Sequence, residues 1–568
     1  MPINGRDNKM VRSSNYIGNI SRTALPRRFP FRSTFSAGKL FPIYADEIYP
    51  GMQKRIDVGA LIRSITPLGP VMDNSFFDIF FFFVPSRLLW DHFEEFIAGY
   101  NKEAWTQGVE YKKPKIIFQA SAAKTADDVN EFLHSFLDYL PGGCDVCSLH
   151  AVMDYINASS DTSEKTVITK RMNDTYWIDA LYPRAMVKIW NDWFRDENLQ
   201  DELELYTGDS NEYADEFAFD LLHSSGLPSA AKYHNRYTSA LPAPLKGPDV
   251  LIPMTGLKVG SFDNAGDNFV QNIMQGVVSE GDDYVVSGLL GGSGSDAETH
   301  MDQPVFANNV SNTIRMLRIA TQTEKLLARD ARGGTRFCES ILSHFAVHNG
   351  DARLQRSEYL GSVQVPLQVQ QVTNTAQGEG SALGNVGGQS VTKFNNHIVN
   401  AAFSEWGILF GFGVVRTNIS YSSGVRKIYQ REGRFDHIWP EFKHIGDVAL
   451  KTRELSTEFS FIFRENFDAD TVFGYTPYAS ERREGYNYNN GLFRGQAKGN
   501  LSYLTYQEVY PTDDIPVLSA DWIKQPEKVV SNTLVDQEGP QYYALFDIQE
   551  VSIEPIDPTS DPGLMDHF

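Results

Sequence analysis

The segment at residues 72–90, MDNSFFDIFFFFVPSRLLW, constrains the fold of this chain more than any other. It contains Phe76 and Phe77 and then four consecutive Phe residues at 80–83. A strand with aromatic side chains on both faces needs cover on both sides, as in the interior of a layered protein. Asp78 interrupts the run and Pro85 ends it, so the apolar stretch is too short for a membrane span. The segment therefore predicts a strand buried inside a large β-protein.

The size and composition of the chain fit an ordered globular protein. Its 568 residues, with 42% hydrophobic and 22% charged residues, allow several cores or one core with long insertions. The aromatic fraction of 12% favours β-structure. Three Cys residues do not make a disulfide framework, which indicates synthesis in a reducing compartment. No apolar segment follows the first Arg residues, so we expect neither a secretory signal nor stable membrane insertion.

Charge is distributed unevenly along the sequence. The net charge is −21, yet residues 1–40 contain one acid, Asp7, and eight bases: Arg6, Lys9, Arg12, Arg22, Arg27, Arg28, Arg32 and Lys39. Residues 529–568 contain eight acids and no Lys or Arg. Two interpretations of the basic end stay open: a solvated, disordered leader, or an arm that presents its cations to a polyanion.

Periodicity predicts strands near both ends of the chain and helices between them. Apolar residues at helical spacing predict helices at residues 88–97, 183–199 and 311–329, and alternation predicts strands at 459–463 and 544–548. A Pro cluster and then a Gly-, Asp- and Ser-rich stretch indicate an inserted excursion. We therefore expect a mainly β fold, a β-sandwich divided into a basic N-terminal arm (1–35), the first part of the sandwich with helical insertions (36–228), a surface insertion (229–305) and the remainder (306–568).

The sequence makes no case for catalysis, and we expect no metal and no cofactor. Cys144, Cys147 and His150 have metal-like spacing, but no second Cys pair completes a zinc site. His344 and His348 are four residues apart without the Glu that a zinc protease needs between them. The Gly-rich residues 288–294 lack the Lys of a phosphate-binding loop and have acidic neighbours, so we expect a flexible loop there.

Several segments, spread in order along the whole chain, resemble the major capsid protein of Microviridae, tailless single-stranded-DNA bacteriophages, and most closely its gokushovirus-like branch. They are TFSAGKLFPIYADEIYPGM (34–52), TPLGPVMDNSFFDIFFFFVPSRLLWDHF (66–93), IWNDWFRDENLQ (189–200), LPAPLKGPDV (241–250), RDARGGTRF (329–337), DARLQRSEYLG (351–361) and PGLMDHF (562–568). The resemblance is weakest at 100–180 and 254–305.

This resemblance implies an eight-stranded viral jelly roll whose copies self-assemble as a homo-oligomer, a T=1 icosahedral capsid around a circular single-stranded DNA genome. It implies residence in the virion after assembly in the host bacterial cytoplasm. It also implies several partners: the genome, a small basic DNA-packaging protein, a minor pilot protein and a host-cell surface receptor. In gokushovirus-like members the insertion that corresponds to residues 229–305 forms a protrusion at the threefold axes.

Two groups of residues are candidates for contacts with these partners. The basic arm interleaves cations with aromatic rings, which suits phosphate neutralisation and base stacking. Its candidates for contact with DNA or the packaging protein are Arg22, Arg27, Arg28, Phe29, Phe31 and Arg32. The alternative is that this arm only ties neighbouring subunits together.

The surface protrusion is the second candidate, for host attachment, with a spacer or a trimer contact as the alternative. Its candidate residues are Gly256, Asp263, Asp267, Asp283, Gly291 and Asp296. Asp263, Asp267, Asp468 and Asp470 are weak candidates for calcium, because isolated Asp pairs are usually solvated.

Two other classes of protein remain as alternatives. A β-sandwich carbohydrate-binding protein without catalytic activity would account for the strands and the Trp residues, but not for the basic arm. A glycoside hydrolase would need a committed pair of carboxylates, and no pair stands out in so acidic a sequence.

Overall fold

The computed structural model describes a large part of the chain: residues 22–98, 111–117, 139–142, 177–213, 226–247, 259–261, 272–274, 278–280, 283–285, 314–333, 336–348, 350–375, 384, 386–457, 471–494, 500–508, 510 and 516–556. The predicted strand at 459–463 and the Cys144–Cys147 pair lie outside this part. Within it, no helix is long and apolar enough to cross a membrane.

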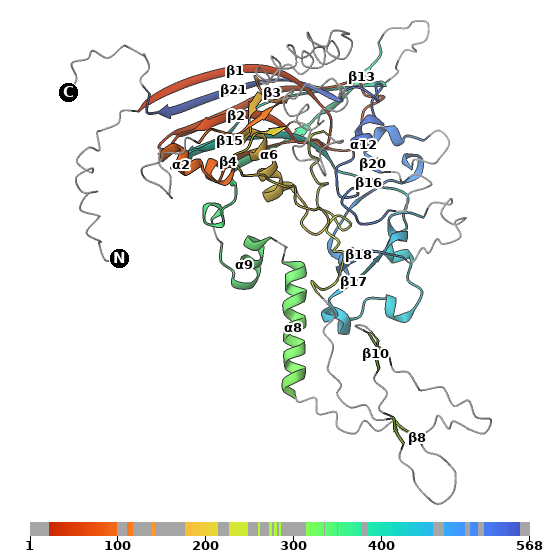
Figure 1. Cartoon of the computed structure of the whole chain (residues 1–568). Coiled ribbons are helices and arrows are strands. Elements are labelled where there is room, and N and C mark those ends of the chain that lie inside the picture. The colour runs from red at the N-terminus through yellow and green to blue at the C-terminus, as the bar shows by residue number, and fades with distance from the viewer. Residues whose placement is uncertain are drawn as a thin grey trace, which may run out of the picture. The chain divides into compact units, whose positions relative to one another are not determined.

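Eight long strands form two sheets that lie one above the other (Figure 1). In chain order they are β1 (Thr23–Phe35), β2 (Phe41–Ile48), β3 (Gln53–Ser64), β4 (Ser75–Pro85), β12 (Glu358–Leu367), β14 (Val386–Ala402), β15 (Gly407–Thr417) and β21 (Tyr542–Glu554). One sheet has the order β1-β21-β3-β14, extended at its edge by β13 (Val369–Thr373). The other has the order β12-β4-β15-β2.

The pairing of these strands is that of a jelly roll. The first long strand pairs with the last (β1 with β21), the second with the seventh (β2 with β15), the third with the sixth (β3 with β14) and the fourth with the fifth (β4 with β12), all antiparallel. The chain is thus one long hairpin, which rolls up because β21 also pairs with β3 and β15 with β4. The predicted eight-stranded jelly-roll β-sandwich is confirmed.

The Phe-rich segment is the buried strand that its sequence predicts. On one face of β4, Phe77 and Phe83 meet aromatic rings of the opposite sheet region, with centroids 6.0 Å from Phe546 and 4.8 Å from Phe403. On the other face, Phe82 lies 5.7 Å from Phe194, in the helical insertion. Both faces of β4 are therefore covered, one by the sandwich interior and one by the chain's own insertion.

The neighbouring strand β15 makes room for these rings with glycine. Gly411 lies opposite Phe81 in the register, and a Cβ atom at Gly411 would stand 2.7 Å from the Phe81 ring. At Gly413 a Cβ atom would be equally close to Phe77. The sequence GILFGFGVV of β15 thus complements the bulk of β4, because no other residue leaves this space free.

The insertion between β4 and β12 contains the predicted helices with shifted bounds. The helix predicted at 88–97 is split into a 3-10 turn η2 (Ser86–Leu88) and α2 (Phe93–Ala98). The helix predicted at 183–199 is α6 (Leu181–Ile189), which continues as a π-helical turn η4 (Trp190–Phe194). It ends there because Arg195 is extended. Outside residues 243–346, the insertion also contains the short strands β5 (Lys115–Ile117), β6 (Trp177–Asp179) and β7 (Glu212–Tyr213) and the turn η5 (Asp351–Leu354).

The same insertion includes a separate compact unit at residues 243–346. It contains β8 (Val259–Ser261), β9 (Asn272–Met274), β10 (Val278–Glu280), β11 (Asp283–Val285), α8 (Ile314–Arg332) and α9 (Phe337–Phe345). The helix predicted at 311–329 corresponds to α8. The compact unit spans residues 243–346, whereas the sequence predicts an insertion at 229–305. Residues 229–242 belong to the sandwich unit because buried Arg236 pairs there with Glu454, whereas both helices after 305 belong to the inserted unit.

A second insertion lies between β15 and β21. Its elements are β16 (Ser420–Tyr421), η6 (Lys427–Tyr429), η7 (Arg434–Asp436), η8 (Pro440–His444), β17 (Asp447–Lys451), η9 (Thr452–Glu454), β18 (Val472–Pro477), α11 (Ser480–Arg483), β19 (Asn487–Tyr488), η10 (Gly491–Phe493), η11 (Ser502–Leu504), β20 (Gln507–Glu508) and α12 (Glu527–Ser531). They surround a second, small apolar core, which includes Leu450, Phe473 and Trp522 and also Tyr237 and Ala240 from the first insertion.

Candidate nucleic-acid interface

The basic segment that the sequence assigned to an arm ends in a strand of the sandwich. Residues 23–35 form β1, paired with β21 along its whole length, so the predicted arm boundary at residue 35 is moved to about residue 22. Alternation along β1 turns Arg28 and Arg32 outward and Phe29 and Phe31 towards the core. Arg22 precedes the strand, and its guanidinium lies over Gly51 in the turn between β2 and β3.

The two aromatic candidates, Phe29 and Phe31, are part of the sandwich. The Phe29 ring stacks on Tyr44 with centroids 6.0 Å apart, and the Phe31 ring stacks on Phe546 at 5.0 Å. Both side chains are partly buried against the main core. Because these faces already pack on protein rings, the structure does not support the expected stacking of bases on them.

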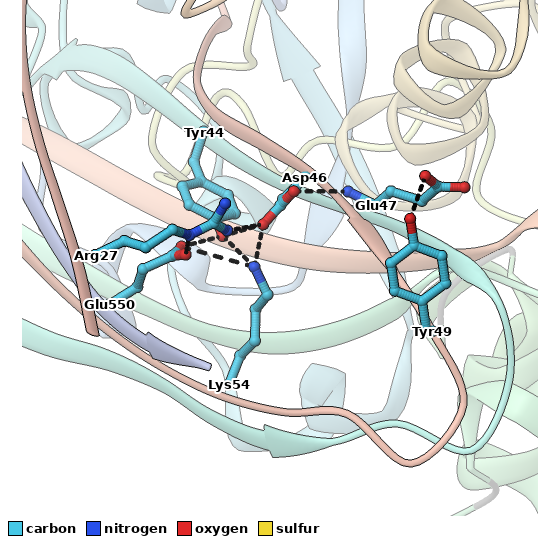
Figure 2. A network of polar contacts seen from close by, with 7 residues as sticks. All are labelled: Arg27, Tyr44, Asp46, Glu47, Tyr49, Lys54 and Glu550. Atoms are coloured by element: carbon cyan, nitrogen blue, oxygen red, sulfur yellow. Dashed lines mark hydrogen bonds and ion pairs between the residues drawn. The ribbon is translucent and has the colours of Figure 1, made fainter. Parts of the chain in front are cut away.

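Arg27 is held in a polar network that joins the two sheets at one edge (Figure 2). Its guanidinium pairs with Glu550 of β21 and, at 2.5 Å, with Asp46 of β2. Lys54 of β3 pairs with the same Asp46, and its ammonium donates a hydrogen bond of 2.8 Å to the Tyr44 hydroxyl. Tyr44 in turn donates to the Glu550 carboxylate at 2.5 Å.

The charges of this network compensate one another out of water. The side chains of Lys54 and Glu550 are fully buried, where an unpaired charge would be costly. Burial alone would raise the pKa of Asp46, but Lys54 and Arg27 outweigh it and hold that pKa below its usual range. Burial and the adjacent carboxylates raise the pKa of Tyr44, which keeps its hydroxyl a donor. Arg27 therefore serves to fasten β1 to both sheets.

The outward side of the β1-β21-β3-β14 sheet is the basic surface of the sandwich. Its exposed cations, here called the basic sheet face, are Arg28, Arg32, Arg55, Arg63 and Lys393. Asp547 pairs with Arg28 at 2.7 Å, and Asp57 pairs with His397 at 2.6 Å and with Arg55 at 3.8 Å. No ion pair joins Arg32, Arg63 or Lys393 to another described residue. In a chain of net charge −21, this face is thus positive and has unneutralised cations.

An open groove of about 740 Å³ lies at one end of this face. Arg63 of β3 and Tyr543 of β21, which are register neighbours, line it together with Asn374, Gln389 and Thr66. The Tyr543 side chain is 45% exposed. A guanidinium beside an exposed ring, with amide and hydroxyl groups around them, has the chemistry that binds a phosphate and stacks a base.

Sequence reasoning missed Arg55, Arg63 and Lys393, which lie far from the N-terminal cluster in sequence. The signal in β3 was alternation: in QKRIDVGALIRS, Arg55, Asp57 and Arg63 share one face and Ile56, Val58 and Ile62 the other. This face lies beside Arg32 and Lys393 only because of the way the strands pair in the sheet. The pairing of strands cannot be deduced from the pattern of a single sequence.

Most of the predicted protrusion residues lie outside the described part of the chain. These are Gly256, Asp263, Asp267, Gly291 and Asp296, together with the calcium candidates Asp468 and Asp470. Asp283 begins β11, which pairs with β10. In the inserted unit, His344 contacts Asp330 at 2.6 Å. Among the residues that the structure describes, no three His, Cys, Asp or Glu side chains are grouped as metal ligands.

An eight-stranded jelly roll with long insertions places the chain among the jelly-roll β-sandwich proteins, a class that includes viral capsid proteins, lectins and cupins. The chain belongs to the phage capsid family described as "Capsid protein (F protein)", whose profile matches residues 14–132 and 156–564. It is 31% identical to capsid protein VP1 of Bdellovibrio phage phiMH2K, over 85% of this chain and 83% of that one. It is 28% identical to capsid protein VP1 of Chlamydia phage 1 over 96% of both chains, and 29% identical to that of Spiroplasma virus 4 over 93% of both.

These comparisons confirm the resemblance to Microviridae capsid proteins. They give the chain a structural role in the virion, as a subunit of a self-assembled shell.

Proposed function

We propose that this protein builds a T=1 icosahedral shell around a circular single-stranded DNA genome, and that the basic sheet face lies against that genome. The similarity to capsid proteins over nearly the whole chain supports the shell. The observation that carries the genome contact is the uneven charge: an acidic protein keeps unneutralised Arg32, Arg63 and Lys393 on one side of one sheet. An enclosed polyanion is the partner that such a surface attracts.

The position of β1 in the sandwich reduces the number of candidate residues for the contact with DNA. Arg27 pairs with buried Glu550, and Phe29 and Phe31 pack against the core of the sandwich. Arg28 and Arg32 lie on the basic sheet face. Residues 1–21 precede this strand in the sequence and add three more cations to the N-terminal segment, Arg6, Lys9 and Arg12. Tying neighbouring subunits together remains the alternative role of that segment.

Charge reversal on the basic sheet face tests the genome contact. The double variant Arg32→Glu and Lys393→Glu removes two phosphate contacts and adds repulsion, so affinity for single-stranded DNA falls and depends less on salt. Each lost contact lowers the slope of log K against log salt by about 0.7. The measurement is a DNA-binding titration at several salt concentrations, together with the absorbance ratio at 260 and 280 nm of purified particles.

The matched control is Arg482→Glu, an exposed cation of the second insertion. If particles of the double variant hold as much DNA as the wild type and the salt slope is unchanged, the basic sheet face does not contact the genome. An equal loss in the control would make the effect one of net charge only.

The proposed shell would also have further partners: a host-cell receptor, a packaging protein and a pilot protein. The inserted stretch at 254–305 is the candidate for attachment to a host-cell receptor, with a spacer or trimer contact as the alternative. Exchanging it for a relative's segment changes adsorption if the proposal holds, and an unchanged host range contradicts it. A small basic packaging protein and a minor pilot protein would share the interior, and assembly would take place in the host cytoplasm.

A further inference from the structure

One segment of the second insertion exposes large apolar side chains at an unusual density. Within 17 residues, Tyr429 and Phe435 are each 74% exposed, Ile438 is 41% exposed and Ile445 is 59% exposed. Scattered apolar residues on a surface are ordinary, but a concentration of them on one segment marks an interaction site. We call these four residues the apolar loop patch. The turns η6, η7 and η8 carry it.

The loop that carries the patch is fixed by its own polar contacts. The Asp436 carboxylate accepts hydrogen bonds from the backbone N–H groups of Gly433 at 2.7 Å and Glu432 at 3.1 Å, and these bonds lower the pKa of Asp436. The Trp439 indole donates to the Arg434 carbonyl at 2.9 Å. A surface that is ordered before binding loses less entropy when a partner docks.

Aromatic contacts anchor the same loop to the body of the insertion. The Phe442 ring meets Tyr478 edge-on at 6.2 Å and also lies 6.2 Å from Phe435. The Tyr478 hydroxyl accepts a hydrogen bond from the Trp439 backbone N–H at 3.1 Å. Phe442 and the Trp439 backbone thus join this loop to Tyr478, whereas Phe435 remains 74% exposed.

The charge around the patch is opposite to that of the chain. Residues 425–446 contain three acids (Glu432, Asp436, Glu441) and five cations (Arg426, Lys427, Arg431, Arg434, Lys443), of which Arg431 pairs with Glu481 outside the segment. The whole chain has a net charge of −21. A second copy of the same chain is therefore an acidic partner, complementary to this segment. Aromatic anchors with Arg neighbours and a polar rim are also the usual composition of the centre of a protein interface.

We propose that the apolar loop patch is a contact between subunits, which docks on a second copy of this chain in the assembled shell. The inference rests on the shell assembly proposed above and adds the surface that makes it. A second copy is the occupant that the charge favours, and in a shell it is present at every position. Tyr429 and Phe435 are the anchors, since they have the largest exposed area to bury.

Assembly of the purified full-length chain tests the contact. Phe435→Asp combined with Tyr429→Asp places two acids at the centre of the interface, so sedimentation and electron microscopy should show free subunits in place of closed particles. Far-ultraviolet circular dichroism and the thermal midpoint should stay near those of the wild type, because both side chains are exposed. The control is Val535→Asp, at a residue that is 61% exposed outside the patch, and it should assemble.

Hydrogen exchange of the unmodified protein gives a second test that needs no variant. Residues 425–446 should exchange at least about tenfold more slowly in assembled particles than in free subunits, because the interface excludes water. Equal exchange in both forms overturns the inference. So does a double variant that forms particles of normal diameter, including the outcome in which those particles fail only to adsorb to cells, which would assign the patch to the host. If the wild type forms no particles at all, the shell proposal itself fails.

Discussion

At the scale of single residues, the buried network at the edge of the sandwich predicts a dependence of stability on pH. Asp46 has its pKa lowered in the folded state by Lys54 and Arg27, which outweigh its burial. Its contribution to stability is therefore fully present above its unfolded pKa, near 3.9, and is lost as pH falls through the lower folded value. Asp46→Asn should lower the free energy of unfolding at pH 7 by about 1.5–3 kcal/mol. The difference from the wild type should begin to shrink below about pH 4 and close at pH values below the folded pKa.

Thermal or denaturant unfolding from pH 3 to pH 7 measures this effect. Asp547→Asn is the matched control, because its partner Arg28 is 67% exposed and such surface pairs contribute less than about 1 kcal/mol. A gap between Asp46→Asn and the wild type that stays constant across this pH range would show that Asp46 acts through packing and not through its charge.

At the scale of elements, β1 separates two functions of the N-terminal region. Deleting residues 1–21 leaves β1 intact, so the thermal midpoint of the subunit should change by no more than a few degrees. Deleting residues 1–35 removes the strand that covers β21, leaves Glu550 and Lys54 without Arg27, and exposes Phe546, so soluble protein should be lost. The measurements are the yield of soluble protein and the thermal midpoint of the two truncated proteins. A soluble, folded 1–35 deletion would contradict the assignment of β1 to the sandwich.

The elements also show how far the sequence alone could go. The Phe-rich strand, α8 and the alternation of β21 follow from local periodicity, and the structure has each of them. The arm boundary at 35 could not be found in this way, because β1 is a strand only through its pairing with residues more than 500 positions away. The same limit hid the basic sheet face, which needs the register of β1, β3 and β14. The predicted start of the insertion at 229 came from a Pro cluster, but the buried pair of Arg236 and Glu454 holds residues beyond it against the second insertion.

At the scale of the whole molecule, two surfaces with different chemistry divide the work of a shell subunit. The cations of the basic sheet face lie on three strands, β1, β3 and β14, and such a spread suits a flexible polyanion without sequence preference. The apolar loop patch is small, aromatic and rigid, which suits a second folded protein. The jelly roll is stabilised by the packed rings of β4 and the glycines of β15, which belong to neither surface. We therefore expect substitutions at either surface to leave the subunit folded.

The orientation of the subunit in assembled particles shows whether the basic sheet face lies against the genome. Cryo-electron microscopy of particles formed by the unmodified protein should show closed shells of uniform diameter. In each subunit the outward side of the β1-β21-β3-β14 sheet, with Arg32, Arg63 and Lys393, should face the lumen and its nucleic acid. Shells in which this side faces the solvent would contradict the proposed contact with the genome. A preparation without closed shells would contradict the proposed assembly.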